Sequence, residues 1–263
     1  MAISENIQQH FRKSEIPFLR VASDWIEQAN NEYRPILTGF LNNREIFLLN
    51  TLINRYPNLK LEANGGYQGA EMKRALIFPD YYAPSVEDYE IVPIQIQYPV
   101  KFAKLKHNQI LGTLMGSGIE RNVIGDIITD GEQWNFLAQK NMSVFLKQEV
   151  DHIGRVKVTL NEIQPTQLIK SKNESVLINL TLSSLRLDIV VASIFNVSRS
   201  IAKGLIMHDK VRLNWFTYNK PDNEISLHDM LSVRGYGRAR LTANNGYSKK
   251  NKNKVEFEVI KNK

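Results

Sequence analysis

Apolar side chains near the start of the chain recur at spacings of three and four, the period of an α-helix. Within residues 16–29 this stripe consists of Phe18, Leu19, Val21, Ala22, Trp25, Ile26 and Ala29. A second helix is expected over residues 43–55, with Asn43 as a candidate cap and Pro57 as its stop. A short strand follows at residues 74–78. The pattern therefore predicts a mainly helical N-terminal domain over residues 1–75.

The middle of the chain alternates between apolar and polar positions, which is the period of a strand with one buried face. The pattern predicts strands at 91–98, 124–128, 133–138 and 155–160, with helices at 107–115 and 142–150. The order β-α-β-β-α-β is that of a ferredoxin-like domain, which we expect over residues 76–165. Such small sheets often bind RNA, but others bind metals, peptides or nothing. However, no pair of exposed aromatic residues matches the stacking signature of an RNA-recognition motif, so the pattern gives RNA binding here little support.

A polar stretch at residues 164–173 reads as a linker and precedes a C-terminal module over residues 176–263. The pattern predicts a strand at 176–182 and helices at 185–195 and 199–207. Ser198 caps the second helix, whose expected inward residues are Ile201, Ala202, Leu205 and Ile206. Two short helices joined by a tight turn resemble a helix-turn-helix, which would suggest DNA. Three alternating strands follow, however, and they favour a different module.

Taken together, these patterns predict an α+β protein in three parts. The parts are a helical N-terminal region, a ferredoxin-like βαββαβ middle domain and a small α+β C-terminal module. No uncharged stretch approaches the roughly 20 apolar residues that a membrane span needs. The N-terminus has no signal-peptide pattern and the chain has no cysteine, so we expect a cytoplasmic protein without disulfides or cysteine-ligated metal.

The positive charge of the chain is concentrated at one end. The formal net charge is +7, yet residues 184–263 contain 15 Lys and Arg against 7 Asp and Glu. A neutral body with one basic module suggests an appendage that binds a polyanion. Part of this charge, Lys249 to Lys254, is interleaved with Asn and Ser and fits a solvated surface tail.

The remaining basic residues lie inside periodic apolar segments, so their positions are fixed by the fold. On the predicted strands they alternate with apolar residues, which puts the charges on one face. Such a face suits phosphate contacts on a structured RNA. The candidate RNA-binding residues are Arg186, Ser198, Arg199, Lys203, Lys210, Arg212, Asn214, Lys220, Arg234, Arg238 and Arg240.

Several chemical alternatives receive less support. The Arg186-Leu187-Asp188 triplet also occurs in pseudouridine synthases, where the aspartate is the nucleophile. Too few residues follow it here for a catalytic domain, and Asp188 is better interpreted as a first-turn residue favoured by the helix dipole. The five histidines show no metal-ligand spacing, and no cofactor motif is present, so we expect no catalytic residue, cofactor or metal.

The motifs of the C-terminal module resemble the RNA-binding domain named after small-subunit ribosomal protein S-four. The matching residues are Arg186-Leu187-Asp188, Ser198-Arg199, Ala202-Lys203, Lys210 to Asn214 and Ser232-Val233-Arg234. Many such domains have Gly where Asp209 stands, and aspartate tolerates the left-handed backbone that this turn would need. Many also have Gly at the position of Trp215, which could stack on a base but more simply covers the edge of the core.

Across nearly the whole chain, the sequence is similar to the YlmH family. The motifs that carry this likeness are His10-Phe11-Arg12, Pro17-Phe18, Trp25 to Gln28, Gly65-Gly66-Tyr67, Gly69-Ala70-Glu71, Lys73-Arg74-Ala75, Tyr98, Lys101-Phe102, Leu111-Gly112, Arg121, Gly125-Asp126-Ile127, Val211 to Trp215 and Arg234 to Arg238. The resemblance implies a ribosome-associated RNA-binding protein linked to a cell-division gene cluster. It also implies a role with stalled large subunits and their tRNA.

These observations lead to one functional hypothesis and one alternative. We expect a non-enzymatic protein that docks on structured rRNA or tRNA, associated with the large ribosomal subunit, in translation or ribosome quality control. The alternative is a cell-division factor whose N-terminal half binds a protein partner.

Overall fold

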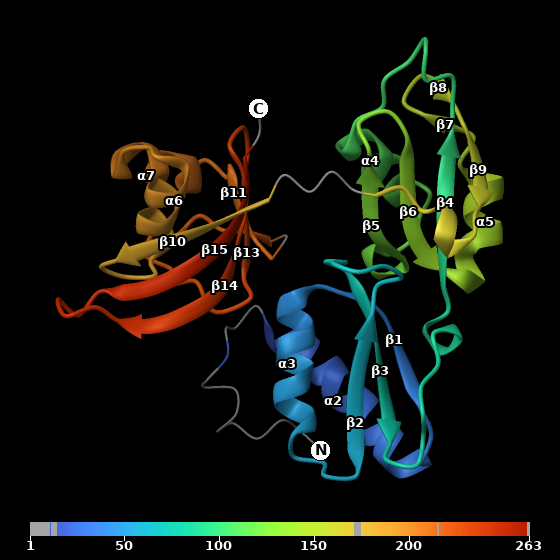
Figure 1. The fold of residues 1–263 in the computed structure, drawn as a ribbon, viewed down its shortest axis with the longest axis horizontal. Helices are drawn as coiled ribbons and strands as arrows, with labels where there is room; N and C mark the ends of the chain where they lie inside the picture. The colour runs from blue at the N-terminus through green and yellow to red at the C-terminus, as the bar shows by residue number, and fades with distance from the viewer. Residues whose placement is uncertain (1–10, 12–14, 171–174, 215, 262–263) are drawn as a thin grey trace. The chain divides into compact units, whose positions relative to one another are not determined.

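A computed structural model describes residues 11, 15–170, 175–214 and 216–261, and it divides into two compact units. The first unit is Met1–Lys172 and the second is Asn173–Lys263 (Figure 1). The family motifs at His10, Arg12 and Trp215 lie outside the described residues. Each unit is an assembly of helices on antiparallel sheets, so the chain is an α+β protein.

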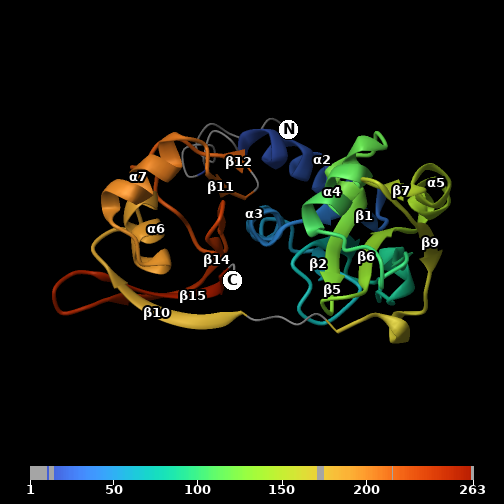
Figure 2. The same ribbon diagram turned by 90° about the horizontal axis from the view of Figure 1, so that it is seen from above.

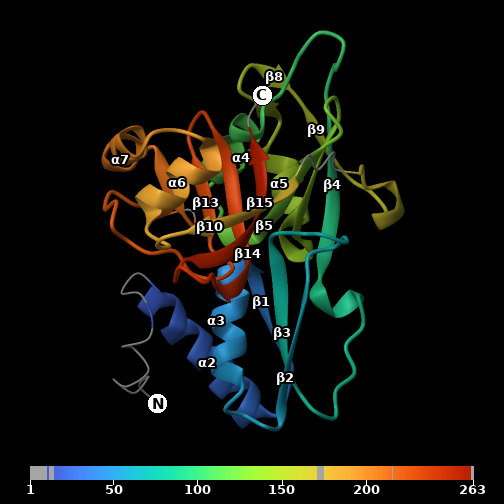
Figure 3. The same cartoon turned by 60° about the vertical axis from the view of Figure 1, so that its left-hand side comes forward.

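The first unit begins with two helices on one side of a three-stranded sheet (Figures 1 and 3). The elements are α2 (Ile16–Glu32), β1 (Ile36–Leu41), α3 (Asn43–Ile53), β2 (Leu59–Asn64) and β3 (Lys73–Pro79). The sheet order is β1-β3-β2, and both pairs are antiparallel. The expected mainly helical domain is therefore wrong: β1 and β2 are strands. Both are short, and β1 pairs with β3 across more than 30 residues, so the local pattern does not reveal them.

A capping box starts α3 one residue earlier than the sequence pattern suggested. The Asn42 side chain accepts hydrogen bonds from the backbone N–H groups of Arg44 (2.9 Å) and Glu45 (3.0 Å). The Glu45 carboxylate in turn accepts one from the Asn42 N–H at 2.8 Å. This reciprocal pair satisfies donors that the first helical turn leaves open, so Asn42 rather than Asn43 is the cap.

A four-stranded antiparallel sheet in the order β5-β6-β4-β9 forms the rest of the first unit. Its elements are β4 (Ile91–Gln97), α4 (His107–Gly116), β5 (Ile124–Thr129), β6 (Trp134–Gln139), α5 (Ser143–Glu149) and β9 (Thr159–Glu162). A small hairpin of β7 (His152–Ile153) and β8 (Val156–Lys157) is inserted before β9. The single strand expected at 155–160 is therefore two strands. Ile110 and Leu114 of α4 and Leu146 of α5 pack on the apolar face of the sheet.

The second unit is a six-stranded antiparallel sheet with two helices on its inner face (Figures 1 and 2). The sheet order is β10-β15-β14-β13-β11-β12. Its elements are β10 (Val176–Leu182), α6 (Leu187–Phe195), α7 (Arg199–Met207), β11 (Val211–Leu213), β12 (Phe216–Thr217), β13 (Met230–Val233), β14 (Gly237–Tyr247) and β15 (Asn253–Lys261). The expected lysine-rich tail is instead the turn of the β14–β15 hairpin and the start of β15.

Helix α7 buries a narrower stripe than the sequence pattern indicated. Ala202 and Ile206 are fully buried, but Ile201 is 50% exposed. Ile201 is therefore not inward, because a nine-residue helix packed on one side shields only the residues that face α6 and the sheet. Within the described ranges, no single helix is long and apolar enough to cross a membrane. Only the pair α6 and α7, bent by 118°, passes such a test by length and composition.

Candidate nucleic-acid interface

The start of α6 places a buried carboxylate between two arginines. Asp188 is fully buried in the first turn, and its carboxylate accepts hydrogen bonds from Arg186 Nε at 3.2 Å and Arg199 Nε at 2.9 Å. Arg199 is the first residue of α7, so this carboxylate also joins the two helices. Both arginine side chains are part-exposed, at 36% and 52%. The arrangement fixes two guanidinium groups at the surface.

The charges of this trio stabilise one another. Burial by itself raises the pKa of Asp188, but the hydrogen bonds and charges of Arg186 and Arg199 outweigh it and lower that pKa below its usual value. The hydrogen bond that Arg186 donates to Asp188 raises the pKa of Arg186. Asp188 is therefore an ionised group that positions arginines. Its buried setting and its two partners match a structural role better than that of a nucleophile.

A loop after β12 is held by backbone hydrogen bonds against the same end of α6. The backbone N–H groups of Leu187 and Asp188 donate to the carbonyl oxygens of Asn223 (2.7 Å) and Pro221 (3.0 Å), and Ile225 donates to Leu185 (3.0 Å). Lys220, an exposed side chain, lies in this loop directly before Pro221. The fold thus brings Lys220 near the start of α6, although more than 30 residues separate them in sequence.

Helix α7 carries a cap and an exposed basic stripe. The Ser198 hydroxyl accepts a hydrogen bond from the Ile201 N–H at 3.2 Å, which is the expected N-cap. Arg199 and Lys203 are four residues apart and exposed, so they share one side of the helix. We call Arg186, Arg199 and Lys203 the helix group.

The outer face of the sheet carries a second set of cations. In the register of β11, β13 and β14, Arg212 lies opposite Ser232, which lies opposite Arg238. Directly opposite residues of antiparallel strands point to the same side. Their neighbours in sequence, among them Val211, Leu213 and Ala239, are buried against the helices, so the arginines point outward.

One step along the same two strands, Lys210 and Arg234 extend this set. The Arg234 N–H donates to the Lys210 carbonyl at 2.8 Å, which continues the pairing of β11 with β13. Lys210 directly precedes β11 and Arg234 directly follows β13, so each lies two residues from Arg212 or Ser232 on the outer face. We call Lys210, Arg212, Arg234 and Arg238 the basic sheet face. The sequence pattern placed these residues together, but only the register shows that Ser232 lies between two of the arginines.

Arg240 and Asn214, two further candidate residues, also make local contacts. Arg240 forms an ion pair with Glu258, which lies directly opposite on β15. Asn214 has a left-handed backbone (φ 50°), and its side chain donates to Asp229 Oδ1 at 2.8 Å and accepts from the Met230 N–H at 2.9 Å. Asp209 is also left-handed, with φ 56°, as its position before β11 suggested. Asn214 therefore holds the turn after β11.

In the first unit, two of the family motifs meet at one carboxylate. Asp126 of β5 accepts hydrogen bonds from the Tyr67 hydroxyl (2.7 Å) and from the N–H groups of Glu71 (2.7 Å) and Met72 (3.1 Å). The neighbouring Gly65 is tightly packed, since a Cβ there would lie 2.3 Å from the Ala70 Cβ. These motifs join the three-stranded sheet to the four-stranded one.

Metal-ligating side chains do not gather in the parts of the chain that the structure describes. Among these residues, no group of three or more His, Asp or Glu is placed to hold a metal ion. The chemistry that the second unit offers is instead that of fixed guanidinium and ammonium groups, which bind phosphate.

Comparison with known proteins also indicates RNA binding. Residues 84–167 match the family model described as "Putative RNA-binding domain in YlmH", and residues 185–231 match the S4 domain. The chain is 35% identical over 253 residues to "Ribosome-associated protein quality control protein P2" of Bacillus subtilis (strain 168), covering 96% of this chain and 98% of the relative. It also resembles the solved structure of "Cell division protein ylmH from Streptococcus pneumoniae", with 35% identity and a TM-score of 0.54. That match covers 62% of this chain and 98% of the other.

Proposed function

Because the chain belongs to the YlmH family of RNA-binding proteins with an S4 domain, we propose that it docks on structured rRNA or tRNA as a non-enzymatic factor. Its place of action is the large ribosomal subunit, in translation or ribosome quality control, and therefore the cytoplasm. The name of the Bacillus subtilis relative supports the ribosomal assignment.

The observation that carries the proposal is the basic sheet face. Arg212 and Arg238 project from β11 and β14, which both pair with β13, and Lys210 and Arg234 lie at the adjacent ends of β11 and β13, where the Arg234 N–H donates to the Lys210 carbonyl. Preset charges lose little conformational entropy when they meet phosphates. Such contacts position a protein on a folded RNA without reading its sequence.

The other candidate residues differ in how directly we propose that they contact RNA. The helix group supplies further phosphate contacts, with Arg186 and Arg199 oriented by Asp188, and Lys220 lies in the loop next to them. Ser198 and Asn214 act on RNA indirectly, by holding α7 and the turn after β11. Arg240 contributes least, because Glu258 neutralises its charge.

For the first unit, we propose an N-terminal domain that includes all of β3, followed by a ferredoxin-like domain; the expected boundary between residues 75 and 76 would cut β3 away from its partners β1 and β2. The sheet order β5-β6-β4-β9, with α4 and α5 on one face, supports the ferredoxin-like assignment. The S4-type module would then span residues 176–263.

The proposal is tested by neutralising the basic sheet face. The full-length variant Arg212→Gln/Arg238→Gln should bind a structured large-subunit rRNA fragment more weakly, because two phosphate contacts are lost. Each lost contact should flatten the log–log salt dependence of affinity by about 0.7–0.9. The matched control is Lys250→Gln/Lys252→Gln, which removes the same charge from the exposed β14–β15 turn. If both variants bind equally well, the basic sheet face is not the RNA site.

The alternative, a protein-binding factor in cell division, is favoured only by the name of the Streptococcus pneumoniae protein. Pull-down of the full-length protein from cells, with and without nuclease, separates the two. Ribosomal components that disappear after nuclease support RNA docking, whereas a division protein retained after nuclease supports the alternative.

A further inference from the structure

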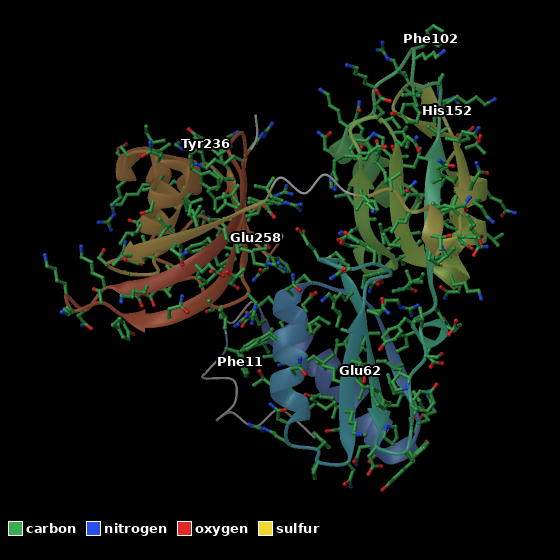
Figure 4. All side chains as sticks on the ribbon, in the orientation of Figure 1. Phe11, Glu62, Phe102, His152, Tyr236 and Glu258 are labelled. Atoms are coloured by element: carbon green, nitrogen blue, oxygen red, sulfur yellow. The ribbon has the colours of Figure 1, made fainter. Side chains whose placement is uncertain are left out.

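The connection between β4 and α4 is a structured turn that projects from the four-stranded sheet. The N–H groups of Phe102 and Ala103 both donate to the Pro99 carbonyl, at 2.9 and 3.1 Å, and Val100 donates to Tyr98 at 2.9 Å. Leu105 is buried and fixes the other end. In Figure 4, Phe102 lies at the tip of this connection, beyond His152. We call residues 99–106 the Phe102 loop.

Phe102 is 90% exposed, more than any other large apolar side chain in the described ranges. At that exposure the ring gains almost no burial from the residues around it. Three backbone hydrogen bonds hold the loop in the conformation that exposes the ring to water. The exposed ring lacks the free energy that burial of an aromatic side chain provides. An aromatic ring displayed in this way is suited to a partner that covers it.

The residues of the Phe102 loop itself are basic, while the acidic Asp130 and Glu132 lie near Tyr98 at its base. Lys101, Lys104 and Lys106 are all exposed, and residues 99–109 contain neither Asp nor Glu. The β7–β8 hairpin packs beside the start of α4, since a Cβ at Gly154 would lie 3.8 Å from Gln109 Nε2. That hairpin adds the exposed Arg155 and Lys157. Its acidic residue, Asp151, pairs with His152 at 3.0 Å.

A single flat ring among lysines fits an unpaired nucleotide. A base gains stacking energy on an aromatic face, and neighbouring ammonium groups neutralise the phosphates on either side. A protein partner of the same surface would require a wider apolar patch, and here lysines surround one ring. We propose that the Phe102 loop is a second RNA site, which binds an unpaired segment by stacking one base on Phe102. This inference rests on the proposed RNA-binding function and adds a site for a different form of RNA.

The test uses full-length protein and a single-stranded RNA oligonucleotide that contains 2-aminopurine, whose fluorescence is quenched on stacking. Phe102→Ala should abolish the quenching and weaken binding about tenfold, the usual scale for one base–aromatic stack. Phe102→Tyr should retain both. The matched control is Tyr81→Ala, which removes an exposed ring that follows Asp80 and should change neither; because the Tyr81 hydroxyl donates to the Tyr33 carbonyl, its melting curve is recorded as well.

Charge is tested separately by Lys101→Gln/Lys104→Gln. This variant should keep the ring but flatten the salt dependence of single-strand binding by about 0.7 per lost contact. Circular dichroism should be unchanged for all these variants, because every substituted side chain is exposed.

Two assays distinguish failure of this inference from failure of the proposed function. Phe102→Ala should leave binding of a fully paired rRNA hairpin nearly unchanged, while Arg212→Gln/Arg238→Gln should leave the quenching intact. If Phe102→Ala quenches and binds single strands like the unmodified protein, the Phe102 loop is not an RNA site, whatever the basic sheet face does. If Phe102→Ala loses a protein partner while its RNA binding is unchanged, the proposal that the Phe102 loop binds RNA is equally overturned.

Discussion

Asp188 is a buried negative charge inside the most basic part of the chain. Its carboxylate holds two arginines that belong to different helices, at 3.2 and 2.9 Å. One residue therefore contributes to folding, by joining α6 to α7, and to the surface, by orienting guanidinium groups. An isolated buried carboxylate would be strongly unfavourable, so the two partners are what allow it to remain ionised.

This arrangement predicts a pH-dependent stability. Asp188→Asn should destabilise the protein by about 1.5–3 kcal/mol at neutral pH, the cost of losing charged hydrogen bonds. Because the folded pKa lies below the unfolded value of about 3.9, the advantage of the aspartate is complete above that value. It is lost as the pH falls through the folded pKa. Urea unfolding of both proteins between pH 7 and pH 2 measures this; a difference that is constant over the range would contradict it.

The exposure of Ile201 predicts that two apolar positions of α7 respond differently to charge. Ile201→Asp should fold, because this side chain is 50% exposed, whereas Ile206→Asp should unfold the module, because Ile206 is fully buried. Circular dichroism and thermal melting of the two variants make the comparison. Unfolding by Ile201→Asp as severe as that by Ile206→Asp would show that α7 is more deeply packed in solution.

At the scale of elements, the cations of the second unit lie on two differently built supports. The helix group depends on a helix start and on one shared carboxylate, whereas the basic sheet face depends on strand register. Substitutions in the two groups therefore have different side effects. Removing Arg199 also takes a partner from the buried Asp188.

Within the helix group, Lys203 and Arg199 should differ, because Arg199 pairs with the buried Asp188 and Lys203 is exposed on α7. Lys203→Gln should flatten the salt dependence of RNA binding by about 0.7–0.9 with unchanged stability, since the lysine is exposed on α7. Arg199→Glu should weaken RNA binding and also lower the melting temperature, because it sets a carboxylate beside Asp188. Salt titrations and melting curves run side by side check both. If Arg199→Glu melts like the unmodified protein, the ion pair does not join the helices.

At the scale of the whole molecule, the two units differ in charge and in the RNA that we propose they bind. Residues 184–263 contain 15 Lys and Arg against 7 Asp and Glu, while the remaining residues are close to neutral. The second unit is also compact by itself and has its own apolar core.

A fragment of residues 173–263 should therefore fold and bind a structured rRNA fragment with much of the affinity of the full chain. Electrostatic attraction to phosphate dominates such affinity, and this unit carries the charge. Filter binding of the fragment, of residues 1–172 and of the full chain measures the division. Structured-RNA binding by residues 1–172 as tight as that of the full chain would assign the main site to the first unit.

Local patterns in the sequence predicted several elements well. Helix α2, strands β4 and β10 and the capped helix α7 follow from periods of 3.6 or 2 over enough residues to be unambiguous. The alternation of Arg212 and Arg238 with apolar neighbours also placed these arginines on one face. The separated sequence motifs were sufficient to identify the family.

By itself, then, the sequence determined the α+β class, the family and the basic end of the chain, because these depend on composition and on short-range order. Only the tertiary structure decided that β1, β2 and β15 are strands, since each is completed by hydrogen bonds to a partner strand. The same holds for the pairing of Asp188 with Arg199, for Glu258 beside Arg240 and for the exposure of Ile201 and Phe102. Tertiary packing sets both the contacts between residues that are distant in sequence and the exposure of each side chain. The periodicity of the local sequence contains no information on either.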